Sequence, residues 1–277
     1  MHSKRIQRFM FRPTIRLTLA AFITVWACSP LEAPAQTPIE PIAEVAPQGR
    51  IVPPPANYQF PNGQKFVYAV EWHMFNAGTA TMRFDRDGDE EKLSATAATA
   101  GTVNFIYPVH SWFDARVEPK TFCSTNVFKH EEGKRKREIQ IRADPSRGKS
   151  IFDEKNLKTG ETRHQEDDAP ACATDILSGF FYIGSRPLLP AGNENLPVVD
   201  GGKPTVVRAR VEAREEIKVP AGDFLAVRVL LDPLSGKFEG KGQIWVWYSD
   251  DAARIPIQMK ARLQWGTVMF RLLRIEK

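Results

Sequence analysis

Residues 65–75, KFVYAVEWHMF, decide the fold because apolar side chains occupy every second position of this stretch. In an extended chain, Glu71 and His73 lie on one face. The opposite face is apolar and carries Phe66, Tyr68, Val70, Trp72 and Met74. One dry and one wet face are typical of strands in antiparallel sheets. The stretch therefore predicts a β-strand that packs one side against a core.

The same two-residue period recurs further along the chain. It is clearest in residues 205–217, TVVRARVEAREEI, and in residues 255–265, IPIQMKARLQW. Turn signals such as Asp87-Gly88 and Pro220-Ala221-Gly222 separate the alternating stretches. We expect roughly ten strands in meander order. A sheet of that length with one apolar face must curl on itself or be covered.

Two stretches have the residue pattern of a helical cover. Residues 174–183 bring apolar side chains together at helical spacing, with Thr174 as N-cap and Gly184 as the stop. Residues 99–113 are a weaker candidate because Pro108 interrupts any helix there. We predict an all-β fold, a mainly antiparallel curved sheet or open barrel with one or two short helices. Residues 59–277 are expected to form it as a single domain.

Residues 1–27 have the features of a signal peptide. Five basic residues precede the apolar run LTLAAFITVWA, which is too short for a stable membrane-spanning anchor. The run ends at Cys28, and VWAC resembles the processing box of bacterial lipoproteins, so we expect a lipid anchor on Cys28. Cleavage after Ala35 is the alternative. Residues 28–58 are rich in proline and predict an extended tether. We expect an exported protein, located in the periplasm or anchored to the outer membrane as a lipoprotein.

Charge and cysteine content restrict the partners. The chain has a formal net charge of +5. Residues 1–35 contribute +4 of it, from five basic side chains and one acid, Glu32, so the rest of the chain is near neutral. Nothing in this balance favours a nucleic-acid or anionic-membrane partner. After processing, Cys123 and Cys172 remain, and an even pair in an oxidising compartment predicts a disulfide worth about 4 kcal/mol. Two buried free thiols are the alternative. The histidines are scattered and none lies at zinc-ligand spacing from a cysteine, so we expect no metal site.

Four segments together resemble a known bacterial family. They are residues 67–84, 174–188, 217–229 and 244–266. The last is the most specific, with a tryptophan at 245 or 247, Ser249-Asp250-Asp251 and Arg254-Ile255-Pro256. The segments resemble the exported family called domain of unknown function 3108, over residues 60–275. The resemblance implies an exported β-rich protein without an assigned activity and supplies no catalytic residues. In outline, such a covered, curved sheet is similar to the periplasmic lipoprotein-carrier half-barrels.

Two polar clusters have a simple structural interpretation. Asp250, Asp251 and Arg254 lie between two strand patterns and predict a hairpin turn in which Arg254 pairs with one aspartate. Acid–base chemistry or calcium binding is the alternative. Residues 134–137, KRKR, follow Glu131-Glu132-Gly133 and predict a hairpin with cross-strand charge pairs. A heparin or nucleic-acid patch is the alternative there.

The aromatic residues are the remaining candidates for a functional site. A curled sheet that does not fill its interior leaves an apolar cavity, so we predict non-enzymatic binding of an apolar or lipid-like ligand, with helix 174–183 as lid. A filled core is the alternative. The rival functions are an envelope protein–protein interaction module and a hydrolase that uses Asp250, Asp251 and His73 or His110. We expect no cofactor, and membrane contact only through the N-terminal lipid. The expected ligand-binding residues are Trp72, Phe105, Trp112, Phe181, Tyr182, Trp247 and Trp265.

Overall fold

The computed structural model describes residues 48–277 apart from 74, 202–203, 236–238, 241 and 264–265. The first eight strands are β1 (Gln64–Trp72), β2 (Phe75–Asp87), β3 (Glu90–Thr99), β4 (Val109–Val117), β5 (Ser124–Gly133), β6 (Arg137–Asp144), β7 (Lys149–Asn156) and β8 (Thr162–Asp168). The other strands are β9 (Asn193–Val198), β10 (Thr205–Val219), β11 (Gly222–Pro233), β12 (Gly242–Ser249), β13 (Pro256–Leu263) and β14 (Gly266–Glu276). The helices are α1 (Gly101–Ile106) and α2 (Ile176–Ser185). The predicted signal peptide and Cys28 lie outside the described residues.

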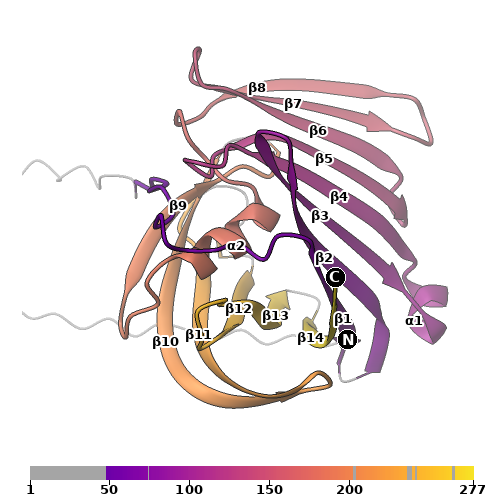
Figure 1. The fold of residues 1–277 in the computed structure, drawn as a ribbon. Coiled ribbons are helices and arrows are strands. Elements are labelled where there is room, and N and C mark those ends of the chain that lie inside the picture. Colours follow the sequence, from indigo (N-terminus) through magenta and orange to yellow (C-terminus); the bar gives the residue numbers. More distant parts are fainter. Residues whose placement is uncertain (1–47, 74, 202–203, 236–238, 241, 264–265) are drawn as a thin grey trace, which may run out of the picture. The chain divides into compact units, whose positions relative to one another are not determined.

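The described strands join one antiparallel sheet of 14 strands in the order β8-β7-β6-β5-β4-β3-β2-β1-β14-β13-β12-β11-β10-β9. The first and last strands, β1 and β14, pair in the middle of the sheet, where Val70 lies opposite Phe270. The edges are β8 and β9, and α2 belongs to the connection between them. Figure 1 shows the sheet curling around α2. The predicted all-β curved sheet with short helices is confirmed.

The sheet has more strands than the roughly ten expected from the pattern. One strand without an apolar face is β8. In β8, six of the seven residues are exposed or half-buried and only Asp167 is buried. Such a strand is held by its hydrogen bonds to β7 rather than by an apolar face, and its charges suit an unpaired edge.

The concave face of the sheet carries the core. Phe66, Tyr68, Phe84 and Leu93 are fully buried there. Helix α2 packs on this face through Phe181, whose ring centroid lies 6.1 Å from that of Phe66 and 5.4 Å from that of Phe84. Packing is what stabilises α2, because an isolated helix of its length is marginal in water.

The boundaries of α2 differ from the predicted span. The helix runs from Ile176 to Ser185 and its N-cap is Asp175, so the prediction that Thr174 is the cap is wrong. Thr174 is still in an extended conformation, because its backbone N–H donates to Pro197 and its carbonyl accepts from Val199. The helix therefore begins after this bridge to β9. The weaker helical candidate forms α1, which ends before Pro108 as expected.

The end of the predicted tether is packed on the domain. The backbone N–H of Arg50 donates to the carbonyl of Asn195 at 3.1 Å. Just after the predicted tether, the ring of Phe60 stacks on those of Phe84 and Phe122, with centroids 5.0 and 4.6 Å away. Residues from about Arg50 onward, inside the predicted tether, thus make hydrogen bonds to the strands and to α2. Alternation of side chains could not show this, because the segment is neither strand nor helix.

Candidate functional site

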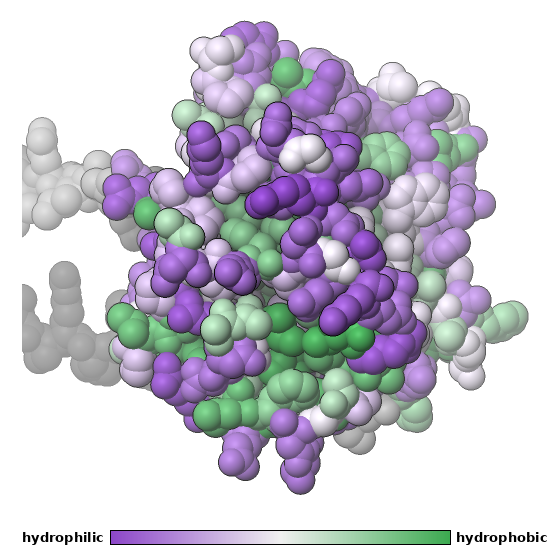
Figure 2. All heavy atoms as spheres, viewed as in Figure 1, coloured by the Kyte–Doolittle hydropathy of each residue, from purple (hydrophilic) through white to green (hydrophobic). Residues whose placement is uncertain are grey.

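The concave face of the sheet holds an open cavity of about 630 Å³ beside α2. Strands from both halves of the sheet form its wall, and α2 contributes Ile176, Leu177 and Phe180. Apolar side chains dominate the wall; those from the strands include Tyr68, Ala80, Met82, Ala95, Ala97, Phe113, Ile244, Met259, Ala261 and Phe270. In Figure 2, apolar side chains are visible in the hollow where Figure 1 places α2.

Small residues create this space. Ala95 and Ala97 on β3 and Ala80 on β2 point to the concave face, where larger side chains would fill the interior. Further along the same strands, Leu93 and Phe84 are fully buried against the core. The cavity therefore opens where the inward positions of adjacent strands change from large to small side chains.

A second cavity of about 260 Å³ lies along another side of α2. Ile176, Phe180 and Ile244 line both cavities. The remaining lining of the second cavity is contributed mainly by β9, β10 and β11, with side chains such as Leu196, Val207 and Leu231. Helix α2 thus stands between two hollows, and the side chain of Phe180 borders each of them.

A buried hydrogen-bond network fixes the start of α2. The Asp175 carboxylate accepts from the backbone N–H groups of Leu177 and Ser178 at 2.8 and 3.0 Å. Its other oxygen accepts from the hydroxyls of Ser124 and Ser178 at 2.6 and 2.5 Å. Asp175 is fully buried. A buried carboxylate needs such partners, and these bonds join the helix to β5.

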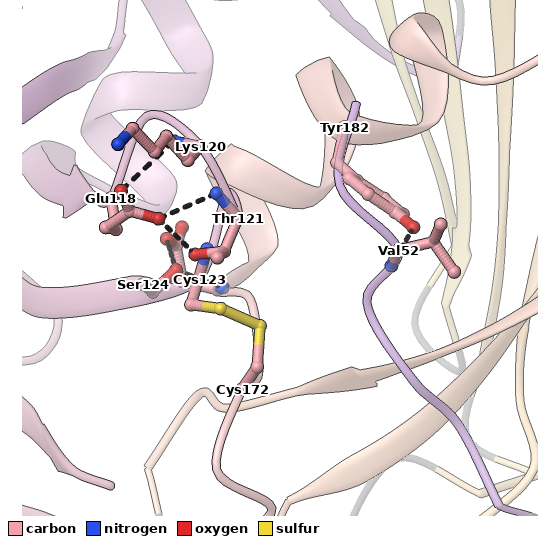
Figure 3. Close-up of a disulfide and its surroundings, with 9 residues drawn as sticks. Val52, Glu118, Lys120, Thr121, Cys123, Ser124, Cys172 and Tyr182 are labelled. Carbon is pink, nitrogen blue, oxygen red and sulfur yellow. Dashed lines mark hydrogen bonds between the residues drawn. A yellow bond between two sulfur atoms is a disulfide. The ribbon is translucent and has the colours of Figure 1, made fainter. Parts of the chain in front are cut away.

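Three tyrosines fix the rest of α2 and the segment that crosses it. The hydroxyl of Tyr248 on β12 donates to the carbonyl of Phe180 at 2.8 Å. Tyr182 donates to Glu194 and accepts from the backbone N–H of Val52 at 3.0 Å (Figure 3). The Tyr58 hydroxyl donates to the carbonyl of Ala253. Burial raises the pKa of Tyr182 and of Tyr58 to about 12.

The disulfide expected from the sequence is present. Cys123 and Cys172 are bonded, with their Cα atoms 5.1 Å apart, and join the start of β5 to the segment before α2 (Figure 3). The Glu118 carboxylate accepts from the Thr121 side chain and backbone, and these hydrogen bonds lower the pKa of Glu118. They hold a tight loop in which the buried Phe122 takes a left-handed φ of 60°. That conformation is unfavourable for a bulky side chain, and the stacking of Phe122 on Phe60 offsets it.

One mouth of the larger cavity is polar. Glu131, Glu132, Lys134 and Arg135 lie around it, whereas Lys129 lines the cavity at a largely buried position. Glu131 is paired with Arg137, with two N–O distances of 2.8 and 3.0 Å. Burial raises the pKa of Glu131, but the hydrogen bond and charge of Arg137 outweigh it and lower the pKa. The ion pair between Glu131 and Arg137 agrees with the predicted charge-paired hairpin.

The predicted ligand-binding aromatics are distributed over different parts of the fold. Trp112 lines the larger cavity at its mouth and stacks on His130, with centroids 3.8 Å apart. Phe181 and Tyr182 belong to α2 and are buried between the helix and the sheet. Trp247 faces away from the cavity and donates to Glu215 at 2.7 Å. Trp72 lies at the end of β1, beside His73.

Neither of the other two predicted residues is placed at a cavity wall by the structure. Phe105 on α1 is 91% exposed, and Trp265 lies outside the described residues. The predicted ligand contacts do not include four residues that line the larger cavity, Phe180, Ile244, Met259 and Phe270. A signal for this cavity exists in the sequence, because Ala95 and Ala97 are small at inward positions, and small inward residues indicate unfilled space.

The polar cluster of the β12–β13 turn has a structural role. The Asp251 carboxylate accepts from the backbone N–H groups of Ala253 and Arg254 at 2.9 and 3.0 Å, as expected for a turn. Asp250 lies 3.6 Å from Arg214. The expected pairing of Arg254 with an aspartate is wrong, because the Arg254 guanidinium donates to the carbonyl of Arg186 at 2.7 Å and so ties the turn to the end of α2.

The histidines of the hydrolase hypothesis lie elsewhere. His73 is exposed in the β1–β2 connection, next to Trp72. His110 is at the start of β4, 3.8 Å from Glu132. Within the described part of the chain, no group of three histidine, cysteine or acidic residues is placed to hold a metal ion. Within the described residues, no helix combines the length and the apolar character that crossing a membrane requires.

Residues 67–273 match a protein family described as a protein of unknown function, DUF3108. The chain belongs to this family. The resemblance seen in the sequence is therefore confirmed, and DUF3108 membership accounts for nearly the whole β-rich domain. The search of curated proteins found no match for the sequence.

Solved structures show similarity in fold. A β-barrel-like protein of domain of unknown function DUF1849 from Brucella abortus is 8% identical, with a TM-score of 0.54 over 82% of this chain and 98% of the other. A predicted exported protein with a YmcC-like fold from Bacteroides fragilis is 9% identical, with a TM-score of 0.36 over 79% and 98%. A predicted lipoprotein from Parabacteroides distasonis is 9% identical, with a TM-score of 0.34 over 79% and 97%. The first similarity supports a barrel-like fold for the DUF3108 chain.

Proposed function

We propose that this protein binds an apolar or lipid-like molecule in the cavity beside α2, without catalysing a reaction. The observation that carries the proposal is the open cavity of about 630 Å³ on the concave face of the sheet. This volume is within the range of about 300–1,000 Å³ typical of small-molecule sites. Its wall is mainly aliphatic and aromatic, and its charged groups other than the largely buried Lys129 come from the end of the β5–β6 hairpin.

The fold gives the cavity the rigidity that a binding site needs. The wall is built from hydrogen-bonded strands, and α2 is fixed at its start by Asp175 and in its middle by Tyr248. A preformed apolar cavity loses little conformational entropy when a ligand enters. The signal-peptide features of residues 1–27 support a location for this binding in the cell envelope.

Two measurements test the proposal on the exported protein. Mass spectrometry of lipids that co-purify with it should detect a bound amphiphile. Titration with cis-parinaric acid, a naturally fluorescent fatty acid, should show saturable binding with an increase in fluorescence. Ala97→Phe should abolish this binding, because Ala97 lines the cavity and the larger ring would occupy it.

The matched control is Ala98→Phe on the same strand. Ala98 lies opposite Thr79 and His110 on the other face of the sheet and does not line the cavity. This variant should bind cis-parinaric acid like the wild type. Equal binding by the wild type, Ala97→Phe and Ala98→Phe would show that the fatty acid binds elsewhere. Absence of binding by the wild type, together with no co-purifying lipid, would refute the proposed function.

A further inference from the structure

Exposed apolar side chains gather at one end of the sheet, around α1. Phe75 at the start of β2 is 72% exposed, and Phe105 and Ile106 on α1 are 91% and 67% exposed. Tyr107 follows them and is also exposed. Figure 2 shows apolar side chains protruding at the right edge of the molecule, where Figure 1 places α1. Apolar side chains this exposed and this close together mark interaction surfaces.

The backbone brings these residues next to a basic turn. The N–H of Ala100, just before α1, donates to the carbonyl of Ala77 on β2. On the other side of α1, the N–H of Lys134 donates to the carbonyl of Pro108. The Lys134 ammonium also lies 5.1 Å from the centre of the Tyr107 ring. We call this surface the α1 rim; it consists of Phe75, Phe105, Ile106, Tyr107, Lys134, Arg135 and Lys136.

The basic side chains of the α1 rim lie close to acidic residues, and the charge of Arg135 helps to lower the pKa of Glu131. Lys134, Arg135 and Lys136 are exposed, and no ion pair joins any of them to a carboxylate in the described part of the chain. The acidic residues that precede them in β5 have other partners. Glu131 is paired with Arg137, and Glu132 lies 3.3 Å from His130. The rim therefore combines protruding aromatic and aliphatic groups with exposed cations that form no ion pair within the described part of the chain.

We propose that the α1 rim binds the surface of a bilayer that contains anionic lipids. Aromatic side chains are favoured at the membrane–water interface, where their apolar rings leave water. Lysine and arginine beside them are attracted to anionic headgroups. Charge complementarity thus favours an anionic lipid surface as the occupant of this rim. The contact is separate from any lipid anchor on Cys28.

The rim also borders the larger cavity. Tyr107, Lys134 and Arg135 line the mouth of that cavity as well as the exposed surface. A protein bound through the α1 rim would hold the mouth of its cavity against the lipid surface. This inference goes beyond the proposed function and does not depend on it, since the rim would bind a bilayer whether or not the cavity holds a ligand.

The test measures contact at the rim itself, so that an anchored N-terminus does not obscure it. Ile106→Cys in the exported protein is labelled with an environment-sensitive nitrobenzoxadiazole dye and mixed with vesicles. Vesicles of phosphatidylcholine with phosphatidylglycerol should increase and blue-shift the emission, and vesicles of phosphatidylcholine alone should have a much smaller effect. Leu189→Cys, at an exposed position in the loop after α2, is the matched control and should respond to neither.

A charge reversal tests the basic part of the rim. Arg135→Glu in the labelled protein should weaken the vesicle response at least about fivefold, the factor that corresponds to one interfacial charge. Lys120→Glu, at the opposite end of β4 and also exposed, should leave it unchanged. Equal responses of the labels at 106 and 189, or equal responses to the two kinds of vesicle, would overturn the proposal.

The same samples separate this inference from the proposed function. Binding of cis-parinaric acid is measured in parallel on the labelled protein without vesicles. A vesicle response with neither fatty-acid binding nor a co-purifying lipid would refute the proposed function and support the rim. Fatty-acid binding without a vesicle response would refute the rim and leave the proposed function in place.

Discussion

The hydroxyl of Ser124 on β5 donates a hydrogen bond of 2.6 Å to the carboxylate of Asp175, and the backbone N–H of Asp175 donates back to that hydroxyl at 2.8 Å. The two residues are 51 positions apart in the sequence. This reciprocal pair connects the N-cap of α2 to the sheet next to the disulfide. The start of the helix is therefore positioned by a covalent link and by buried hydrogen bonds at the same place.

Asp175→Ala should lower the free energy of unfolding by about 3 kcal/mol, because it removes a helix cap and leaves buried donors without an acceptor. The measurement is a urea or guanidinium unfolding curve. Thr174→Ser, one residue earlier, retains the hydroxyl and should cost less than about 1 kcal/mol. Similar losses for the two variants would contradict the role assigned to the Asp175 carboxylate.

Two glycines of α2 should respond in opposite directions to alanine. A Cβ atom at Gly184 would lie 2.8 Å from the carbonyl oxygen of Arg254 and 3.3 Å from the Tyr248 ring. Gly184→Ala should therefore cost about 1–3 kcal/mol through overpacking against the β12–β13 turn. A Cβ atom at Gly179 would meet only ordinary contacts of 3.6 Å or more, and Gly179→Ala should gain about 0.5–1 kcal/mol from helix propensity.

Unfolding curves of both glycine variants check this pair. A stabilised Gly184→Ala protein would show that α2 has room to move away from Arg254 and Tyr248. It would then follow that the helix is less firmly fixed on its sheet than the hydrogen bond from Tyr248 to Phe180 indicates.

The sequence predicted those parts of the fold whose signal is local. The alternation in 65–75 and the helical spacing after Thr174 identified β1 and α2, and the cysteine count identified the disulfide. The N-cap was placed one residue too early because the bridge between Thr174 and Val198 depends on a strand that follows later in the chain. Long-range pairing of this kind has no local pattern.

The candidate site was harder to predict for the same reason. Aromatic density drew attention to Trp247 and Phe105, but the face on which a side chain lies depends on register and on the curvature of the whole sheet. Trp247 is directed to the outer face, where Glu215 accepts its N–H. The cavity results from small inward residues such as Ala95 and Ala97. In a sequence, such positions are small residues where large ones would be expected, and they form no recognisable motif.

Alkaline pH should destabilise the protein through its buried tyrosines. Burial raises the pKa of Tyr182 from 10 to about 12. The unfolded state therefore loses the phenolic proton at a lower pH than the folded state. Stability is retained below pH 10 and falls as the pH rises toward 12, by at most about 1.4 kcal/mol per pH unit for each such group.

Unfolding curves recorded between pH 9 and the pKa of about 12 test this sign. In Tyr182→Phe, the free energy of unfolding should fall less steeply with pH, by up to about 1.4 kcal/mol per pH unit. Tyr58→Phe should act in the same direction, because burial raises its pKa to about 12 as well. If stability decreased equally steeply in both variants and the wild type, other groups would be responsible for the alkaline transition.

The adjacent residues Phe180 and Phe181 should separate stability from ligand binding. Phe181 is only 3% exposed and packs against Phe66 and Phe84. Phe181→Ala should therefore cost about 3–5 kcal/mol, as expected for truncation in a packed core. Phe180 borders both cavities, so part of its surface already faces empty space. Phe180→Ala should cost less stability and should mainly weaken the binding of cis-parinaric acid.

Each phenylalanine variant is the control for the other, because both remove the same group from the same helix. Denaturant unfolding gives the stability. Titration with cis-parinaric acid, without denaturant and at a temperature well below that of thermal unfolding, gives the affinity. A larger loss of stability in Phe180→Ala than in Phe181→Ala would show that the interior around α2 is filled. The proposal that the cavity on the concave face is free to hold a ligand would then be wrong, and Phe180 would be an ordinary core residue.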